Sequence, residues 1–390
     1  MLDPIKNLAE TLIKAEEFST IEWLICQSGN TLSKGFVKSK NSKFSHTGKK
    51  NPIYRIYSMT KPIVSFATLI GVEQNKIKLY DNVSTYIDSF KNVKVLSKNG
   101  CLQDPMRPIT IEDLLTHRSG LSYGFNRFCP VGQKYAQDGL INKNHLNLAD
   151  FVDKIAEFPI AFEPGTAWRY SVSTDVLARV LEIVFEDGIE NILKNCVFNQ
   201  LDMNDTDFYV PNEKLPRLVP MSGDPNLDKI TDINDIPPDL TETNMDGFYP
   251  SDRLRGQPRG GHGLFSTVAD YQKFAKLLLN GETTSGKRII SPAMLHFSLQ
   301  NRISREQMPL YIDTIPQNGY GWSLLGRIME NTSKSLTLAN KGEHGWAGAA
   351  TTYFWVDPQY DLTGVVMSQL LGSRFSLGEE IRSKTYTLIP

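Results

Sequence analysis

The sequence has few cysteines and no surplus of charge of either sign. Its 390 residues include 42 lysines and arginines and 43 aspartates and glutamates, for a formal net charge of -1. This balance gives no indication of a nucleic-acid or acidic-membrane partner. A chain of this size does not need disulfides, so scattered thiols without CxxC spacing favour a reducing compartment. The four cysteines are Cys26, Cys101, Cys129 and Cys196.

Long hydrophobic runs and paired histidines are also missing. No stretch approaches the roughly 18 apolar residues of a membrane span. The N-terminal segment MLDPIKNLAETLIKAEEF spreads acids and lysines through an amphipathic pattern and lacks the apolar core of a signal peptide. We therefore expect a cytoplasmic protein with no membrane partner. The six histidines never occur at a metal-ligand spacing such as HxxxH, so no metal and no cofactor is predicted.

Strand-like segments occur near both ends of the chain. After a first helix, residues 20–27 and 33–39 are rich in strand-forming residues and are separated by a turn signal. Near the C-terminus, YGWSLLGRIME, SLTLANK, GAATTYFWVD and DLTGVVMSQL are successive expected strands, and SLGEEIRSKTYTLI is a closing helix. We expect an α/β fold with a central antiparallel sheet built from both termini and flanked by helices.

The middle of the chain has helical patterns separated by long irregular stretches. TIEDLLTHRSG begins with a capping threonine, Thr110, and similar start and stop signals bound residues 173–188 and 267–281. We therefore predict a sheet domain of residues 1–80 and 260–390, an inserted helical and loop-rich domain of residues 81–259, and an active site between them. The irregular segment 211–259 is expected to shape the pocket.

The segment YRIYSMTKPIVSFATLIG, residues 54–71, places a serine and a lysine one turn apart at the start of an apolar helix. Such a helix is normally buried, and burial lowers the pKa of a lysine. Ser58 next to a neutral Lys61 amine would be an activated nucleophile. Pro62 requires the helix to begin close to Ser58 or to be kinked there, although a residue before proline disfavours helical geometry.

Two other interpretations of these serines remain open on the residues alone. Ser58 could simply cap the helix while Lys61 reaches solvent. Ser122, in GLSYG, fits the G-x-S-x-G nucleophile elbow, which requires a strand before the serine and a helix after it. Here the preceding segment is helical and the following one is not, so the context disfavours Ser122.

Further motifs give the chain a resemblance to a known family. SMTK, LLTHRSGL, FEPGTAWRYS, GGHGLFSTVADYQKFAKLLLNG and HGWAGAATTYFWVDP follow one another in the order found in the class C β-lactamase-like serine hydrolases. This family includes class C β-lactamases, D,D-peptidases, D-aminopeptidases and the family VIII carboxylesterases, which the chain resembles most. The resemblance extends from about residue 53 to the C-terminus and implies a penicillin-binding-protein-like fold.

The resemblance assigns roles to individual residues. It implies that Ser58 is acylated, that Lys61 accepts its proton and that Tyr170 relays protons, for which nearby amines should lower the phenol's pKa. Trp346 and Gly348 match the third motif, W-G-G in family VIII esterases. The N–H groups of Ser58 and Ala349 would then form the oxyanion hole. The structural alternatives are that Tyr170 is only a core residue and that Gly348 only forms a strand bulge.

Two departures from the lactamase and peptidase motifs bear on the substrate. Val172 replaces an asparagine that would bind a substrate amide, and Trp346 replaces a cation that would bind a carboxylate. His344 or Lys341 could partly replace that cation. We predict a carboxylesterase acting on a small-molecule ester, with an amidase, D-aminopeptidase or β-lactamase as the enzymatic alternative and a catalytically silent binding protein as the other. The oligomeric state stays open.

Overall fold

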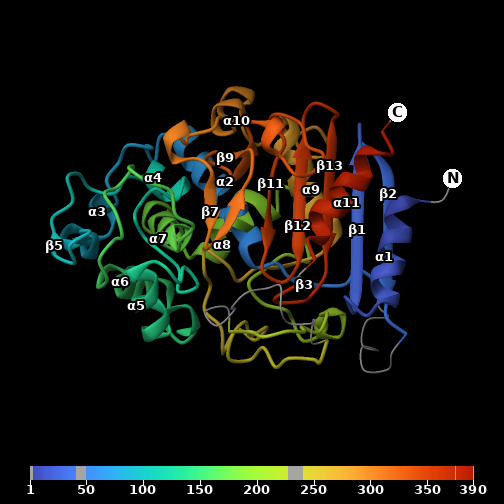
Figure 1. Ribbon diagram of the computed structural model, residues 1–390, viewed down its shortest axis with the longest axis horizontal. Helices are drawn as coiled ribbons and strands as arrows, with labels where there is room; N and C mark the ends of the chain where they lie inside the picture. Colours follow the sequence, from blue (N-terminus) through green and yellow to red (C-terminus); the bar gives the residue numbers. More distant parts are fainter. Residues whose placement is uncertain (1–2, 41–49, 227–239, 374, 390) are drawn as a thin grey trace.

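The computed structural model describes residues 3–40, 50–226, 240–373 and 375–389. Within them, seven strands form one antiparallel sheet in the order β2-β1-β13-β12-β11-β10-β9. Its strands are β1 Thr20–Gln27, β2 Asn30–Lys38, β9 Tyr320–Trp322, β10 Arg327–Met329, β11 His344–Gly348, β12 Thr352–Asp357 and β13 Leu362–Met367. The first two come from the N-terminal part and the other five from the C-terminal part, as predicted, and Figure 1 shows the blue and red strands side by side.

Two of the expected strands differ from the structure. YGWSLLGRIME forms two short strands, β9 and β10, because Gly326 has a φ of 135° and the chain reverses between them. SLTLANK forms no strand. Its two leucines, Leu336 and Leu338, are 86% and 56% exposed, so no sheet face or core holds the segment extended. SLTLANK has the alternating pattern of a strand, but it lacks the packing partner that would stabilise one.

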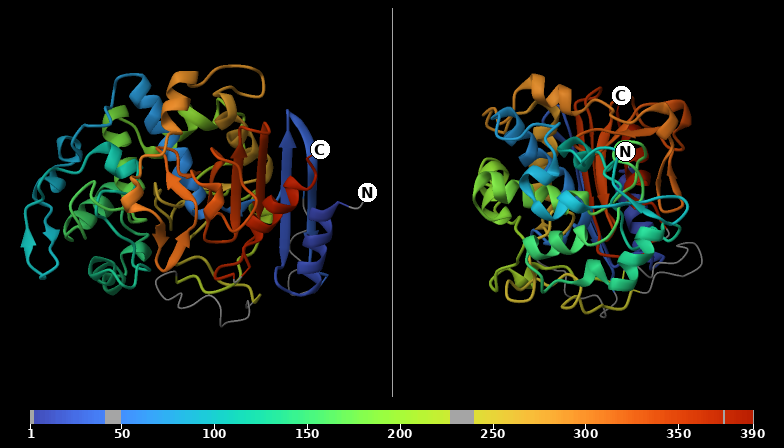
Figure 2. Two further views of the ribbon diagram at one scale, coloured as in Figure 1. Left: turned by 45° about the horizontal axis from the view of Figure 1, so that its top comes forward. Right: turned by 90° about the vertical axis from the view of Figure 1, so that its left-hand side faces the viewer.

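Helices cover both faces of the sheet and fill the region beside it (Figures 1 and 2). α1 and α11 pack on one face, and α9 packs on the other face against β1, β12 and β13. The helices are α1 Pro4–Lys14, α2 Thr60–Glu73, α3 Val83–Tyr86, α4 Ile111–Leu115, α5 Pro130–Asp138, α6 Leu148–Ala156, α7 Ser173–Phe185, α8 Ile189–Leu193, α9 Val268–Asn280, α10 Pro292–Ser298 and α11 Leu377–Tyr386.

Short two-stranded pairs complete the described secondary structure. The strands are β3 Tyr54–Arg55 with β6 Phe265–Ser266, β4 Val95–Leu96 with β5 Leu102–Gln103, and β7 Leu310–Ile312 with β8 Ile315–Gln317. Among the described residues, 81–259 contribute no strand to the seven-stranded sheet. The proposed division of the chain into domains stays a prediction.

The central strands have no polar face because both faces of the sheet are covered. All six residues of β12 are buried, and they alternate between two hydrophobic clusters. Phe354 and Val356 belong to the large cluster that also contains α2, α7 and α9, whereas Tyr353 and Trp355 belong to the cluster beneath α1 and α11. A run of buried residues of this kind is the signature of a strand packed on both sides.

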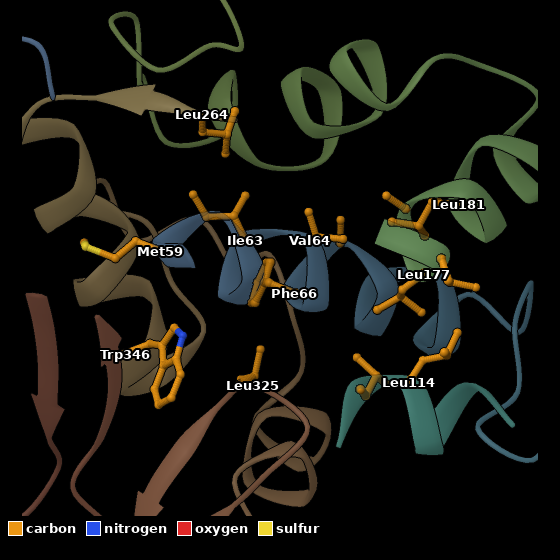
Figure 3. Packing of buried hydrophobic residues seen from close by; sticks show 14 of the residues in the cluster. Met59, Ile63, Val64, Phe66, Leu114, Leu177, Leu181, Leu264, Leu325 and Trp346 are labelled. Carbon is orange, nitrogen blue, oxygen red and sulfur yellow. The ribbon is translucent and has the colours of Figure 1, made fainter. Parts of the chain in front are cut away.

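Helix α2 crosses the large cluster, as its apolar sequence predicts. Its residues from Thr60 to Gly71 are all buried. Figure 3 shows Ile63, Val64 and Phe66 among side chains from α4, α7 and the strand region. The first turn of this helix, which holds the candidate catalytic lysine, is therefore fixed by packing on all sides.

No helix of the described residues is long and apolar enough to cross a membrane. All four cysteines are free thiols. A cytoplasmic location stays a prediction.

Gly364 offers a test of the sheet packing. In the β12–β13 register it lies opposite Trp355, and a Cβ at position 364 would lie 2.2 Å from that buried indole. Because a rigid buried ring cannot move away, Gly364→Ala is expected to lower the free energy of unfolding by about 2 kcal/mol in urea denaturation. Gly188→Ala, whose Cβ would meet nothing within 4 Å, is the matched control. Equal unfolding midpoints for the two variants would contradict this packing.

Candidate active site

The turn that precedes α2 presents Ser58 at the protein surface. Residues Tyr57–Met59 form a 3₁₀ turn, and α2 follows directly at Thr60. Ser58 is partly exposed, whereas its two neighbours are buried. Tyr57 has a φ of 45°, an unfavourable backbone conformation for a residue with a bulky side chain. This strained residue lies directly beside the serine, a position where strained backbone often accompanies function.

The same geometry accounts for Pro62. The residue lies third in α2, within the first turn, where its missing N–H interrupts little of the helical hydrogen bonding. The helix therefore begins close to Ser58, as predicted. Lys61 has helical geometry despite preceding a proline, and the buried packing around α2 holds it there.

Lys61 is buried and makes three polar contacts. Its Nζ lies 3.2 Å from Ser58 Oγ, 2.8 Å from the Tyr123 hydroxyl and 2.6 Å from the Gly261 carbonyl oxygen. The Lys61 side chain is only 3% exposed. The alternative interpretation, in which Lys61 reaches solvent, is therefore wrong. Burial lowers the pKa of Lys61 to about 7, and the negative charge of Asp175 opposes that shift.

Tyr170 also lies next to Ser58 and Lys61. Its hydroxyl accepts a hydrogen bond from Trp346 Nε1 at 3.0 Å, and Ser58 is close enough to act on its pKa. Its ring lies beneath Lys61 Nζ, 4.7 Å from the ring centroid. Burial raises the pKa of the phenol above its ordinary value, more than the hydrogen bonds lower it. The expectation that amines lower the pKa of Tyr170 is thus wrong, because desolvation is the larger effect.

An aromatic cluster holds the Tyr170 ring. His117, Trp168, Trp322 and Trp346 all place their rings within 6.4 Å of it, centroid to centroid. Trp322 packs edge-on against Trp346 at 4.6 Å. Burial holds the pKa of His117 well below its ordinary value, so this ring is a neutral packing partner.

Trp346 and Gly348 lie on β11, which packs against the 3₁₀ turn of Ser58. A Cβ at Gly348 would lie 2.3 Å from the carbonyl oxygen of Ile56, so only glycine lets the two backbones approach this closely. Ala349 follows β11 directly and is exposed. This close approach supports the prediction that the Ala349 N–H lies near Ser58, and Gly348 is more than a strand bulge.

Two predicted substrate-binding residues, Val172 and His344, lie differently from expectation. The Val172 side chain is part of the buried core at the start of α7, so it presents no surface to a substrate. His344 is buried, its Nδ1 lies 3.1 Å from the Gly342 carbonyl oxygen, and burial lowers its pKa to about 4. It is therefore neutral near pH 7 and does not replace the missing cation. Lys341 is exposed in the turn before β11.

The rival nucleophile Ser122 is fully buried, and it lies in a loop with no strand before it. Its hydroxyl accepts a hydrogen bond from Asn126 Nδ2 at 3.1 Å, a structural role. The residue that matters in GLSYG is its neighbour Tyr123, which contacts Lys61 and which the sequence analysis missed.

Asp175 was also missed. It lies in the first turn of α7 and is 1% exposed, and its Oδ1 accepts the Gly261 N–H at 2.9 Å. A lone acidic residue in the apolar pattern STDVLARV was the available signal, but a helix N-terminus commonly carries an acid without any function.

A cavity of about 330 Å³ adjoins this cluster. Trp168, which packs on the Tyr170 ring, forms part of its wall, and the exposed rings of Phe128 and Tyr311 lie on its rim. Arg169 also lines it. None of Ser58, Lys61 and Tyr170 lines this cavity, so it neighbours the candidate catalytic groups without containing them.

Part of segment 211–259 contacts the nucleophile turn. The Tyr249 ring lies 4.7 Å from that of Tyr57, centroid to centroid, and its hydroxyl donates to the Leu264 carbonyl at 2.6 Å. Residues 227–239 lie outside the described residues, so the expected role of the whole segment in shaping the pocket stays a prediction. The described residues contain no group of three or more His, Cys, Asp or Glu side chains arranged to hold a metal.

Comparison with known proteins places the chain in a family. The Beta-lactamase family model matches residues 5–385. Lovastatin esterase from Penicillium rubens is 27% identical over 360 residues, covering 85% of this chain and 84% of that protein. Esterase EstB from Burkholderia gladioli is 24% identical over 326 residues, covering 82% and 78%.

A solved structure has the same fold. EstCE1, described as a hydrolase with promiscuous acyltransferase activity, superimposes with a TM-score of 0.80 at 21% identity, covering 98% of this chain and 97% of that one. The predicted α/β fold is thus confirmed, and the related esterases and acyltransferases support an enzyme of the hydrolase and acyltransferase class. Because the family match runs from the first helix to the last, the chain belongs to the β-lactamase family, as its motifs predicted.

Proposed function

We propose that this protein is a carboxylesterase that forms an acyl-enzyme at Ser58. The observation that carries the proposal is the contact between a partly exposed serine and a buried lysine, with Ser58 Oγ 3.2 Å from Lys61 Nζ and the Tyr170 ring centroid 4.7 Å from the same Nζ. A nucleophile beside a base of suitable pKa, both fixed by further contacts, is the arrangement that acyl transfer requires.

Lys61 is the general base in this proposal. With a pKa of about 7, a large fraction of it is a neutral amine near neutral pH. A neutral amine has two N–H donors and one lone pair. The Gly261 carbonyl can only accept and takes one N–H, and the Tyr123 oxygen can take the other. The lone pair is then directed toward the Ser58 hydroxyl.

Acylation follows from this arrangement. The Ser58 proton passes to Lys61 as Oγ bonds to the ester carbonyl carbon, and the carbonyl oxygen becomes an oxyanion between the N–H groups of Ser58 and Ala349. The carbon–oxygen bond to the alcohol then breaks. Tyr170 is protonated when this bond breaks. It gives its proton to the departing alkoxide and then takes one from the Lys61 ammonium.

Deacylation repeats these steps with water. The water loses a proton to Lys61 through Tyr170 as its oxygen attacks the acyl carbon, and the acid leaves as Ser58 Oγ recovers the proton. Lys61 and Tyr170 return to their starting states, so protons balance over the cycle.

The substrate is proposed to be a small-molecule ester with a neutral group near the nucleophile. Trp346 stands where lactamases and peptidases have a cation, and His344 is neutral, so a substrate carboxylate has no charged partner from β11. This counts against β-lactam and peptide substrates and favours the ester over the amidase, D-aminopeptidase and β-lactamase alternatives. The proposal includes a cytoplasmic location and neither a nucleic-acid nor a membrane partner.

Acyl transfer to an alcohol is the second candidate. EstCE1 is described as having promiscuous acyltransferase activity, and the acyl-enzyme proposed here would accept an alcohol wherever it accepts water. Adding 1-butanol to an ester assay and measuring the butyl ester by gas chromatography separates the two fates. The catalytically silent alternative requires that no acyl-enzyme forms.

Ser58→Ala is expected to reduce turnover of p-nitrophenyl butyrate by at least about 1,000-fold, because the nucleophile is lost. The wild-type protein should be labelled by a fluorophosphonate at Ser58, as detected by mass spectrometry of the labelled peptide. Ser122→Ala is the matched control and should still be labelled. Turnover by pure Ser58→Ala at the wild-type rate would disprove the proposal.

The pH dependence of kcat/KM should report Lys61. Because the neutral amine is the active form, kcat/KM for a neutral ester is expected to fall tenfold per pH unit below about pH 7, the pKa of Lys61. No loss from Tyr170 ionisation is expected up to pH 9, since burial raises its pKa. A stopped-flow or initial-rate profile from pH 5 to 9 measures this, and a rate independent of pH across that range would be the contrary result.

Trp346→Phe tests the hydrogen bond to Tyr170. The change keeps an aromatic ring but removes the Nε1 donor, and losing one such bond is expected to lower kcat by about threefold to tenfold. Trp23→Phe, which removes an indole donor to Ser33 in the cluster beneath α1 and α11, should leave kcat unchanged. If both variants had the wild-type kcat, the Trp346 bond would have no catalytic effect.

A further inference from the structure

Asp175 is a buried carboxylate that the proposed mechanism does not use. It is 1% exposed and lies in the first turn of α7, which packs against α2. Its Oδ1 accepts the Gly261 N–H, whereas its Oδ2 has no hydrogen-bond partner among the residues that the structure describes. Burial raises the pKa of this carboxyl, and the charge of Lys61 is the largest influence that opposes the shift, ahead of the Gly261 and Gly260 backbone and Arg259.

Gly261 connects this carboxylate to Lys61. Its N–H donates to Asp175 Oδ1 at 2.9 Å, and its carbonyl oxygen accepts from Lys61 Nζ at 2.6 Å. A Cβ at position 261 would lie 2.4 Å from Asp175 Oδ2 and 2.8 Å from the Tyr123 hydroxyl. Only a residue without a side chain fits between the three groups, so the bare backbone of one glycine joins the carboxylate to the amine.

The other charged or titratable groups around Asp175 do not replace it. Arg259 lies nearby, but its guanidinium donates to the carbonyl oxygens of Pro258, Lys143 and Leu146. Burial lowers the pKa of His262 to about 3, so this ring is neutral.

The aromatic neighbours of Lys61 are neutral as well. Burial raises the pKa values of Tyr123 and Tyr170 and lowers that of His117. Asp175 is the one charged group that shifts the pKa of Lys61 among the described residues, and its effect is upward.

We propose that Asp175 is a positioning residue for Lys61: it holds the Gly261 backbone against the amine and supplies the negative charge that balances the ammonium formed when Lys61 takes the Ser58 proton. The inference rests on the proposed role of Lys61 as general base. Burial alone would make Lys61 a weak base, because a low-dielectric site disfavours the ammonium. The Asp175 charge restores part of the basicity, while no carboxylate of the described residues contacts the amine directly, where an ion pair would hold it protonated.

Asp175→Asn separates this role from a merely structural one. Asparagine has the same shape and its oxygen can still accept the Gly261 N–H, but the charge is lost. Without that charge the ammonium is less stable, so Lys61 stays neutral at lower pH. The acid limb of the kcat/KM profile is expected to move down by about one pH unit, and the plateau to fall by about tenfold as the base weakens.

The matched control is Asp113→Asn. Asp113 is equally buried, and its charge is already paired with the Arg107 guanidinium. This variant should lower the melting temperature without moving the acid limb, as a structural carboxylate would. An acid limb of Asp175→Asn that stays within 0.3 units of wild type, or moves upward, overturns the inference.

The rate of fluorophosphonate labelling, followed against pH, distinguishes the inference from the proposed function itself. If wild-type Ser58 is not labelled, the proposed function fails and the inference fails with it. If wild type and Asp175→Asn are both labelled with the same pH dependence, only the inference fails. A downward shift in the labelling profile of Asp175→Asn that matches its kcat/KM profile is the expected result.

Discussion

The site depends on an amine held in the protein interior next to a hydroxyl that solvent can reach. Water would keep a lysine protonated near pH 7, so only removal from water makes Lys61 a base there. The burial comes from α2, whose residues are enclosed by α7, α4 and the sheet. One turn earlier, the 3₁₀ turn leads the chain out of this core and exposes Ser58. The partly exposed Ser58 and the buried Lys61 are thus only three residues apart in the sequence.

Close backbone approach is the second requirement. Gly261 brings its carbonyl to the Lys61 amine, and Gly348 brings β11 against the turn at Ile56. A methyl group at either position would meet backbone or polar atoms within 2.4 Å. The strained φ of Tyr57 is maintained because its ring packs on Tyr249. Three separate parts of the chain therefore fix one serine, which explains why the motifs are spread along so much of the sequence.

Sequence reasoning was most successful where one segment determines its own structure. The apolar run after Lys61 predicts a buried helix, and the segments at both ends of the chain predict the sheet. It failed where partners are distant in sequence: SLTLANK has a strand pattern but no neighbour, and Val172 and His344 align with substrate-binding positions but pack into the interior. Tyr123 and Asp175 were missed because each becomes relevant only when folding brings it to Lys61 or Gly261. The opposing effects on the pKa of Tyr170, hydrogen bonding against desolvation, could be ranked only once its burial was known.

Trp346 shows how a single replacement can change both recognition and the reacting groups. Its apolar ring removes the cation that would bind a carboxylate, which the sequence alone indicated. Its indole N–H also donates to the Tyr170 hydroxyl, which the sequence did not indicate. A phenol oxygen that accepts this bond still has its own proton to donate. The tryptophan thus fixes the orientation of a proton donor that burial keeps neutral. Restoring a cation at this position would therefore disturb Tyr170 as well as substrate preference, so the two properties are coupled through one side chain.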